Sequence, residues 1–93
     1  MIKIVAKMPI KADKVEEFKA VAAELVAKSS AEEGNVFYSI NVSTKNPRML
    51  AFIECWRDQE ALDIHNATEH FQRIVPAINE LCEESSAEFF TDL

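Results

Sequence analysis

Residues 36–56, VFYSINVSTKNPRMLAFIECW, contain two apolar runs separated by a short polar segment. The runs Val36–Val42 and Met49–Trp56 are rich in β-branched and aromatic side chains, which favour extended strands. The segment Lys45–Arg48 between them has the composition of a turn. Two strands with so short a connection are expected to pair as an antiparallel hairpin. One face of the second strand is expected to carry Leu50, Phe52, Glu54 and Trp56.

A strand and a helix are predicted before this hairpin. Ile2–Met8 alternates apolar and polar residues with the period of a strand, and Pro9 ends it. Asp13 and Glu16 resemble a capping box at a helix start. Gly34, the only glycine of the chain, is expected to end that helix in a left-handed conformation. The apolar residues at helical spacing are Val15, Phe18, Val21, Ala22, Leu25 and Val26.

Two further helical pieces and a strand are predicted after the hairpin. Asp58 can cap a short helix, and Thr68 can cap a second one. Pro76 lies inside the second helix and is expected to bend it or start a new turn. Ala87–Leu93 has the pattern of a final strand. The apolar stripe of the second helix comprises Phe71, Ile74, Val75, Ile78, Leu81 and Cys82.

This order of elements predicts one domain, residues 1–93, with an α+β, ferredoxin-like β-α-β-β-α-β fold. Right-handed crossovers then place the helices on one face of a four-stranded antiparallel sheet. Both faces of the strands carry apolar residues, such as Val5 on one side and Phe37 and Tyr38 on opposite sides of their strand. A bare apolar face normally marks an interface. The sequence therefore predicts a homodimer in which two sheets pack face to face.

The composition excludes some classes of partner. The formal net charge is −6, and the ten lysines and arginines are scattered among acids. No basic face is therefore expected for nucleic acid or for an anionic membrane. No apolar run approaches the length of a membrane helix or of a signal peptide core. Two cysteines, Cys55 and Cys82, are too few for a disulfide framework, so we expect a cytoplasmic protein with reduced thiols.

Few side chains in this chain could carry chemistry. The two histidines, His65 and His70, are five residues apart, a spacing that does not place them on one helix face. The cysteines form no metal-binding pair, so no metal site is expected. A glycine-rich phosphate loop and a nucleophile elbow are also missing, which disfavours a tightly held nucleotide or flavin.

The remaining candidates surround the end of the third strand. Trp56 closes that strand, and Glu54 lies on its face two residues earlier. If the second helix folds back over the sheet, His65 and Phe71 would border an apolar cavity suited to a small aromatic ligand. A neutral His65 could act there as a general base. Each residue also has a simpler interpretation. Trp56 could be plain core, and His65 could be a capping or surface residue, or the partner of Glu69 on a helix surface.

One pattern in this region resembles a known family. The pattern is Phe52-x-Glu54-x-Trp56-x-Asp58-x-Glu60-Ala61-Leu62-x-x-His65-x-x-Thr68-x-His70-Phe71. It is similar to the signature of antibiotic biosynthesis monooxygenase (ABM) domains. Glu32-Glu33-Gly34-Asn35, before Tyr38, resembles the helix-to-strand turn of the same family. The resemblance covers essentially the whole chain and implies a dimeric α+β barrel.

The resemblance also implies a function. The family includes quinol monooxygenases that need neither metal nor flavin, because an electron-rich phenol loses a proton and its anion reacts with dioxygen. By this resemblance the chain would act on a small aromatic, quinol-like substrate without any cofactor. His65 would be the base, and Trp56, Tyr38 and Phe71 would form the pocket walls. We also expect Glu54 to contact the substrate. Tyr38 could instead hold a substrate oxygen.

Other branches of the family imply different tasks. A haem-degrading branch uses an Asn on the first strand, a Trp in the short helix and a His later in the second helix. In this chain the first strand has no Asn, the short-helix place holds His65, and the later place falls near Val75. These differences disfavour haem degradation. Another branch isomerises a phosphorylated dione and shares the Glu-Glu-Gly-Asn turn, and His65 could serve that enolisation too. A third possibility is a non-catalytic module that only binds a small ligand.

Overall fold

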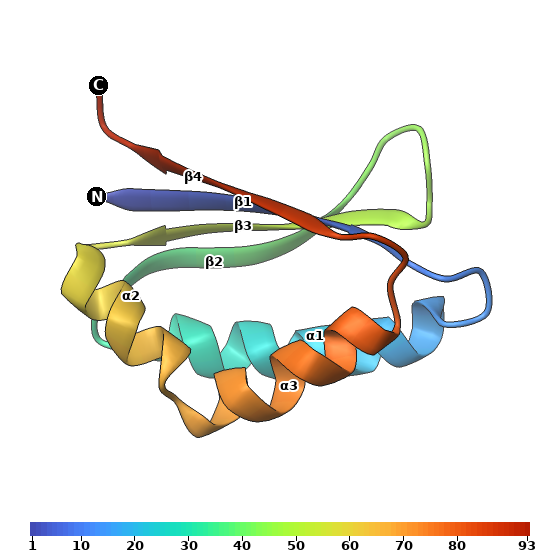
Figure 1. The fold of residues 1–93 in the computed structure, drawn as a ribbon, viewed down its shortest axis with the longest axis horizontal. Coiled ribbons are helices and arrows are strands. Elements are labelled where there is room, and N and C mark those ends of the chain that lie inside the picture. The colour runs from blue at the N-terminus through green and yellow to red at the C-terminus, as the bar shows by residue number, and fades with distance from the viewer.

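The computed structural model of this protein describes residues 1–93 as one four-stranded sheet and three helices (Figure 1). The strands are β1 (Ile2–Pro9), β2 (Asn35–Val42), β3 (Met49–Trp56) and β4 (Ser86–Thr91). The helices are α1 (Val15–Ser30), α2 (Gln59–Asn66) and α3 (Glu69–Glu80), and none has the length and apolar character needed to cross a membrane. The sheet order is β2-β3-β1-β4 with every neighbouring pair antiparallel, which confirms the predicted ferredoxin-like α+β fold.

β2 and β3 form the predicted hairpin. Their register runs from Val42 opposite Leu50 to Asn35 opposite Trp56. In the connecting turn the Ser43 hydroxyl accepts hydrogen bonds from two backbone N–H groups. Because β3 also pairs with β1, it is an inner strand, and its alternate side chains lie near the middle of the sheet.

All three helices cover the same face of the sheet, as Figure 1 shows, and the hydrophobic core fills the space between the two layers. The chain ends of β1 and β4 lie side by side, in agreement with their pairing. Phe18, Leu25, Ile74 and Trp56 are at most 2% exposed, and burying each such side chain contributes about 1.5–3 kcal/mol. The face of β3 that was predicted to point inward does so, with Leu50, Phe52, Glu54 and Trp56 buried.

The start of α1 differs from its prediction. The residue before the helix is Lys14, and no side chain caps the free N–H groups. A capping box needs its acidic partner three residues after the capping residue. Because Lys14 occupies the capping position, Asp13 lies one residue too early to cap the helix. The capping box predicted from Asp13 and Glu16 is therefore wrong.

Gly34 is also used differently from its prediction. No residue of the chain has a positive φ, and α1 ends through Ala31 in an ordinary right-handed conformation. What Gly34 provides is space, because a Cβ atom at this position would overlap the Cβ atom of Ala61 in α2. The single glycine thus allows the turn after α1 to approach α2 closely.

The two predicted caps after the hairpin are confirmed. Asp58 accepts a hydrogen bond from the Ala61 amide at 2.9 Å and begins α2. The Thr68 hydroxyl accepts from the Phe71 amide at 3.2 Å and begins α3. The same hydroxyl donates to the His65 carbonyl at 2.7 Å, so it joins the end of one helix to the start of the next. These local bonds position His65 over the sheet.

The sheet face opposite the helices has no cover within the chain. Phe37, Ile53 and Phe90 project from it with exposures of 45%, 38% and 44%. They come from β2, β3 and β4, so the apolar character extends across the sheet. The homodimer suggested by this face stays a prediction.

Candidate active site

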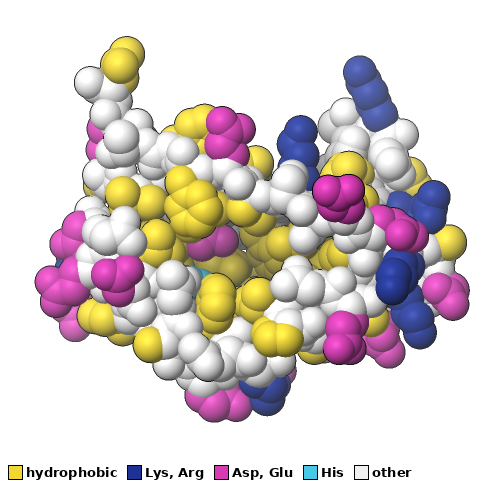
Figure 2. All heavy atoms as spheres, in the orientation of Figure 1, with side chains coloured by type: hydrophobic (Ala, Val, Ile, Leu, Met, Phe, Trp, Pro, Cys, Tyr) yellow, Lys and Arg dark blue, Asp and Glu magenta, His cyan; other side chains and the backbone are white.

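A cavity of about 340 Å³ lies between the sheet and the helices. Twelve of its 18 lining residues are hydrophobic, and none is a lysine or arginine. Glu54 is the only acid and His65 the only histidine among them. Figure 2 shows the hollow, with acidic and histidine atoms at its bottom and hydrophobic side chains around it. The remaining polar lining residues are Asn66, Asn79, Ser85 and Ser86. Both the size and the lining are those of a small-molecule site.

His65 belongs to the last turn of α2 and is 1% exposed. Its ring stacks on Trp56, with centroids 4.2 Å apart and planes 31° apart. The edge of Phe71 packs against it, with centroids 5.1 Å apart. Burial lowers the pKa of the imidazole, although hydrogen bonding to Glu32 opposes this shift. Burial thus favours the neutral ring.

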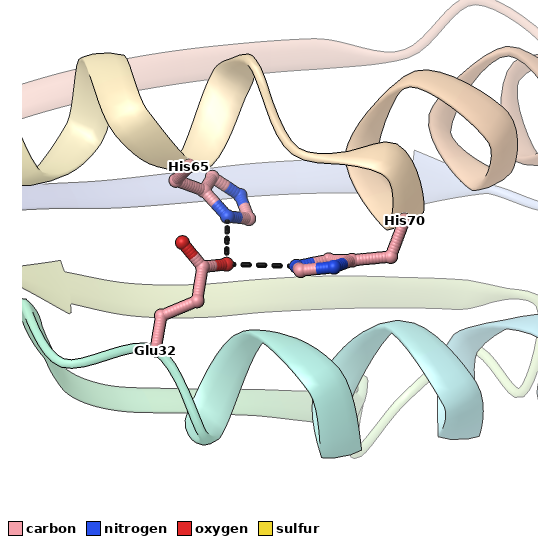
Figure 3. A group of neighbouring side chains, drawn as sticks. All are labelled: Glu32, His65 and His70. Atoms are coloured by element: carbon pink, nitrogen blue, oxygen red, sulfur yellow. Dashed lines mark hydrogen bonds and ion pairs between the residues drawn. The ribbon is translucent and has the colours of Figure 1, made fainter.

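His65 and His70 share one carboxylate, that of Glu32 (Figure 3). The Glu32 Oε2 atom lies 2.7 Å from His65 Nδ1 and 2.8 Å from His70 Nε2. Three separate segments supply the residues: the turn after α1, the end of α2 and the start of α3. Sequence reasoning placed Glu32 only in the turn motif and gave it no role. The five-residue spacing of His65 and His70 prevents a shared face only if both residues lie on one helix. They lie on two helices, α2 and α3, and can therefore meet.

The Glu32 group contains the residue types that hold metals such as zinc. Its three possible ligand atoms lie within 4.8 Å of one another. Ligand atoms about 2.0–2.2 Å from a tetrahedral ion would be roughly 3.3 Å apart. The observed 2.7 and 2.8 Å separations are shorter and have the length of hydrogen bonds. The arrangement is therefore that of a hydrogen-bonded cluster, and binding of a metal ion would require the three ligand atoms to move apart.

Glu54 lies on β3 and points toward the helices, with 6% exposure. The indole N–H of Trp56 donates to its Oε1 atom at 2.8 Å. Burial raises the pKa of the Glu54 carboxyl and the negative charge of Glu32 adds to this shift, whereas hydrogen bonding to Trp56 and Tyr38 opposes it. No lysine, arginine or histidine forms an ion pair with it.

The structure brings most of the candidate residues to one place. Tyr38 and Phe71 line the cavity together with Glu54 and His65. Tyr38 is 8% exposed, and its burial raises the pKa of the phenol well above its usual range. Trp56 differs from expectation, because it does not line the cavity. It is fully buried behind it, where it supports Glu54 and His65.

Comparison with known proteins identifies relatives of this fold and sequence. Residues 1–77 match the model of the family described as antibiotic biosynthesis monooxygenase. YcnE of Bacillus subtilis (strain 168), whose name assigns it a monooxygenase activity provisionally, is 38% identical over 81 residues, which are 87% of this chain and 85% of YcnE.

Solved structures agree with this result. A crystal structure described as an antibiotic biosynthesis monooxygenase superposes with a TM-score of 0.93 at 36% identity, covering 100% of this chain and 99% of the other. A conserved protein from Methanosarcina mazei Go1 gives a TM-score of 0.92 at 32% identity, covering 96% and 89%. The chain therefore belongs to the antibiotic biosynthesis monooxygenase family.

Proposed function

We propose that this protein is a monooxygenase that needs no cofactor and oxidises a small quinol-like aromatic with dioxygen, using His65 as the base. The hydrogen bond between Glu32 and His65 at the edge of an apolar cavity carries this proposal. A carboxylate that holds one nitrogen of a buried imidazole is the arrangement that prepares the other nitrogen for proton transfer.

The tautomer of His65 follows from its partner. An ionised Glu32 can only accept hydrogen bonds, so His65 Nδ1 carries the proton of the 2.7 Å contact. Nε2 then has a free lone pair, and it has no hydrogen-bond partner in the protein. The buried side-chain atoms that lack a partner are Ser29 Oγ and Glu32 Oε1, so Nε2 is not sealed off. It is free to accept a proton from a ligand.

The proposed reaction balances with dioxygen as the only co-reactant. His65 Nε2 takes a hydroxyl proton from the quinol, and Glu32 stabilises the imidazolium that forms. The electron-rich ring then forms a carbon–oxygen bond to dioxygen, and the peroxide anion receives the proton back from His65. Loss of the proton on that carbon breaks the oxygen–oxygen bond. One oxygen remains as a new carbonyl and the other leaves as water.

The cavity lining favours an uncharged aromatic over a phosphorylated carbonyl compound. A phosphate group is normally bound by lysine, arginine or a helix N-terminus. None of the lining residues is a lysine or arginine, and neither Glu54 nor a neutral His65 supplies a positive charge there. The same lining gives the phosphate of a flavin nucleotide no cationic partner. This supports the quinol proposal against the isomerase alternative.

The experiment is oxygen uptake with naphthohydroquinone, corrected for autoxidation, by protein dialysed against a chelator and checked for flavin. His65→Asn is the matched variant, because its amide can still donate to Glu32 but offers no base in the place of Nε2. We expect the variant to lose about 10²–10⁴-fold in rate, the usual contribution of a general base. Equal rates for both proteins, or no uptake by either across a set of quinols, would refute the proposal. Binding of quinones without any uptake would instead favour a ligand-binding module.

We further propose that the protein acts as a homodimer in the cytoplasm, with the open sheet faces packed together. Support comes from the three exposed side chains Phe37, Ile53 and Phe90 on that face. Light scattering at micromolar concentration should give twice the monomer mass, and Ile53→Lys should shift it to the monomer. A monomeric wild type would contradict the dimer.

A further inference from the structure

We propose that Glu54, in its protonated form, is the hydrogen-bond donor that holds a carbonyl or phenolate oxygen of the ligand in the cavity. This inference rests on the proposed function, because it names a second group in the same site. It also narrows the ligand to an uncharged aromatic with an acceptor oxygen in addition to the hydroxyl group that His65 would deprotonate.

The environment of Glu54 disfavours its ionised form. The side chain is 6% exposed, and no cationic group pairs with it. The titratable groups around it are Tyr38, the neutral-favouring His65 and the carboxylate of Glu32, and none of them supplies a fixed positive charge. A buried carboxylate without a cation normally takes up a proton. A ligand that expels water from the cavity strengthens this tendency.

Trp56 determines which oxygen of Glu54 carries the proton. An indole N–H can only donate, so Oε1 must be the acceptor in the 2.8 Å bond. The proton of a neutral carboxyl group therefore belongs on Oε2. No hydrogen bond of ordinary geometry joins Oε2 to the protein, and Oε2 is not among the buried atoms that lack a partner. Hydrogen bonding to Trp56 and to the Tyr38 hydroxyl lowers the pKa of the Glu54 carboxyl, but by less than burial raises it. Since Glu54 lines the cavity, Oε2 presents its O–H to the bound ligand.

Glu54 and His65 then form a complementary pair. His65 Nε2 accepts a proton from a ligand hydroxyl, and the negative charge that results spreads through the ring onto any conjugated oxygen. Glu54 donates a hydrogen bond to that oxygen and keeps its proton throughout. A donor placed where charge develops, in a site with little water, stabilises the anion more than water would. A neutral carboxyl group is suited to this task because it does not repel the anion.

The test is binding of a matched pair of ligands that undergo no turnover. α-Tetralone has an acceptor oxygen, and tetralin has the same rings without it. Binding can be followed through the fluorescence of Trp56, the only tryptophan, which is buried beside Glu54. For the wild type we expect tetralone to bind about 2- to 10-fold more tightly than tetralin, the value of one hydrogen bond. This preference should fall as the pH rises through the titration of Glu54.

Two variants separate the donor from its surroundings. Glu54→Gln keeps an acceptor for Trp56 and a donor for the ligand, so it should retain the preference for tetralone and lose its pH dependence. Glu54→Leu should bind both ligands equally. A preference that survives in Glu54→Leu, or that disappears in Glu54→Gln, would overturn the inference.

Infrared spectroscopy reports directly on the same group. The carbonyl band of a protonated carboxyl group should appear in the tetralone complex of the wild type near neutral pH and be missing in Glu54→Gln. A spectrum in which Glu54 stays ionised in the complex would overturn the inference. These measurements need no turnover. A failed oxygen-uptake assay would therefore reject the proposed function and leave the role of Glu54 in binding unaffected. Failed binding and infrared tests would reject the role of Glu54 and leave the proposed function unaffected.

Discussion

Glu32→Gln is the substitution that most sharply tests the support of His65. The 2.7 Å bond joins a carboxylate to the imidazole, and the Glu32 side chain is 12% exposed, so solvent weakens it little. A hydrogen bond to a charged group is worth about 1.5–3 kcal/mol, and an amide oxygen in its place retains about 0.5–1.5 kcal/mol. The difference of about 1–2 kcal/mol applies when His65 becomes an imidazolium. It corresponds to a loss of about 5- to 30-fold in kcat/KM.

The assay is steady-state oxygen uptake over a range of pH. Since Glu32 raises the pKa of His65, its loss should move the acidic limb of the pH profile to lower pH while the plateau falls. Glu33→Gln is the matched control, because this neighbouring side chain is 95% exposed and lies 3.8 Å from its nearest cation, on Arg57. It should leave both the rate and the profile unchanged. A Glu32→Gln variant with the plateau and limb of the wild type would refute the role given to Glu32.

Three further outcomes are expected. In the wild type the acidic limb of kcat/KM should have its midpoint below 6.5, because burial lowers the pKa of His65 and only the neutral ring accepts a proton; a midpoint above 6.5 would contradict this. His70→Phe, which removes the 2.8 Å bond to Glu32, should reduce kcat/KM about 2- to 10-fold, whereas His70→Gln can keep that bond and should lose less. Gly34→Ala should lower the free energy of unfolding, measured with urea, by about 1–3 kcal/mol, because the new Cβ atom overlaps that of Ala61. Adding Ala61→Gly should restore part of this stability. Equal stability of Gly34→Ala and the wild type would show that the overlap of the two Cβ atoms does not matter.

Much of the fold could be predicted because its signals are local. The alternation of Met49–Trp56 determined which face of β3 points inward. The caps Asp58 and Thr68 act within three residues of their partners, so their sequence spacing was sufficient. The same kind of reasoning failed at Asp13, where a shift of one residue in the helix start removed the expected bond.

The site was less predictable because its contacts join distant segments. Glu32 lies 33 residues from His65 and 38 from His70, and only packing of the three helices brings them together. The close approach of Gly34 to Ala61 is part of the same packing. The sequence predicted a left-handed conformation for Gly34, but its φ is not positive, and the residue is needed because it has no Cβ atom. The position of Trp56 relative to the cavity could not be predicted from the sequence either, because its ring lies behind the cavity wall and does not line the cavity.

The most direct test of the central claim is the origin of the oxygen in the product. Naphthohydroquinone should be incubated with the wild type and with His65→Asn under dioxygen labelled with a heavy isotope, and the product examined by mass spectrometry. The account predicts one labelled oxygen in each hydroxynaphthoquinone formed by the wild type, and little labelled product from the variant. Labelled product formed equally by both proteins, or quinone formed by the wild type without any label, would contradict it.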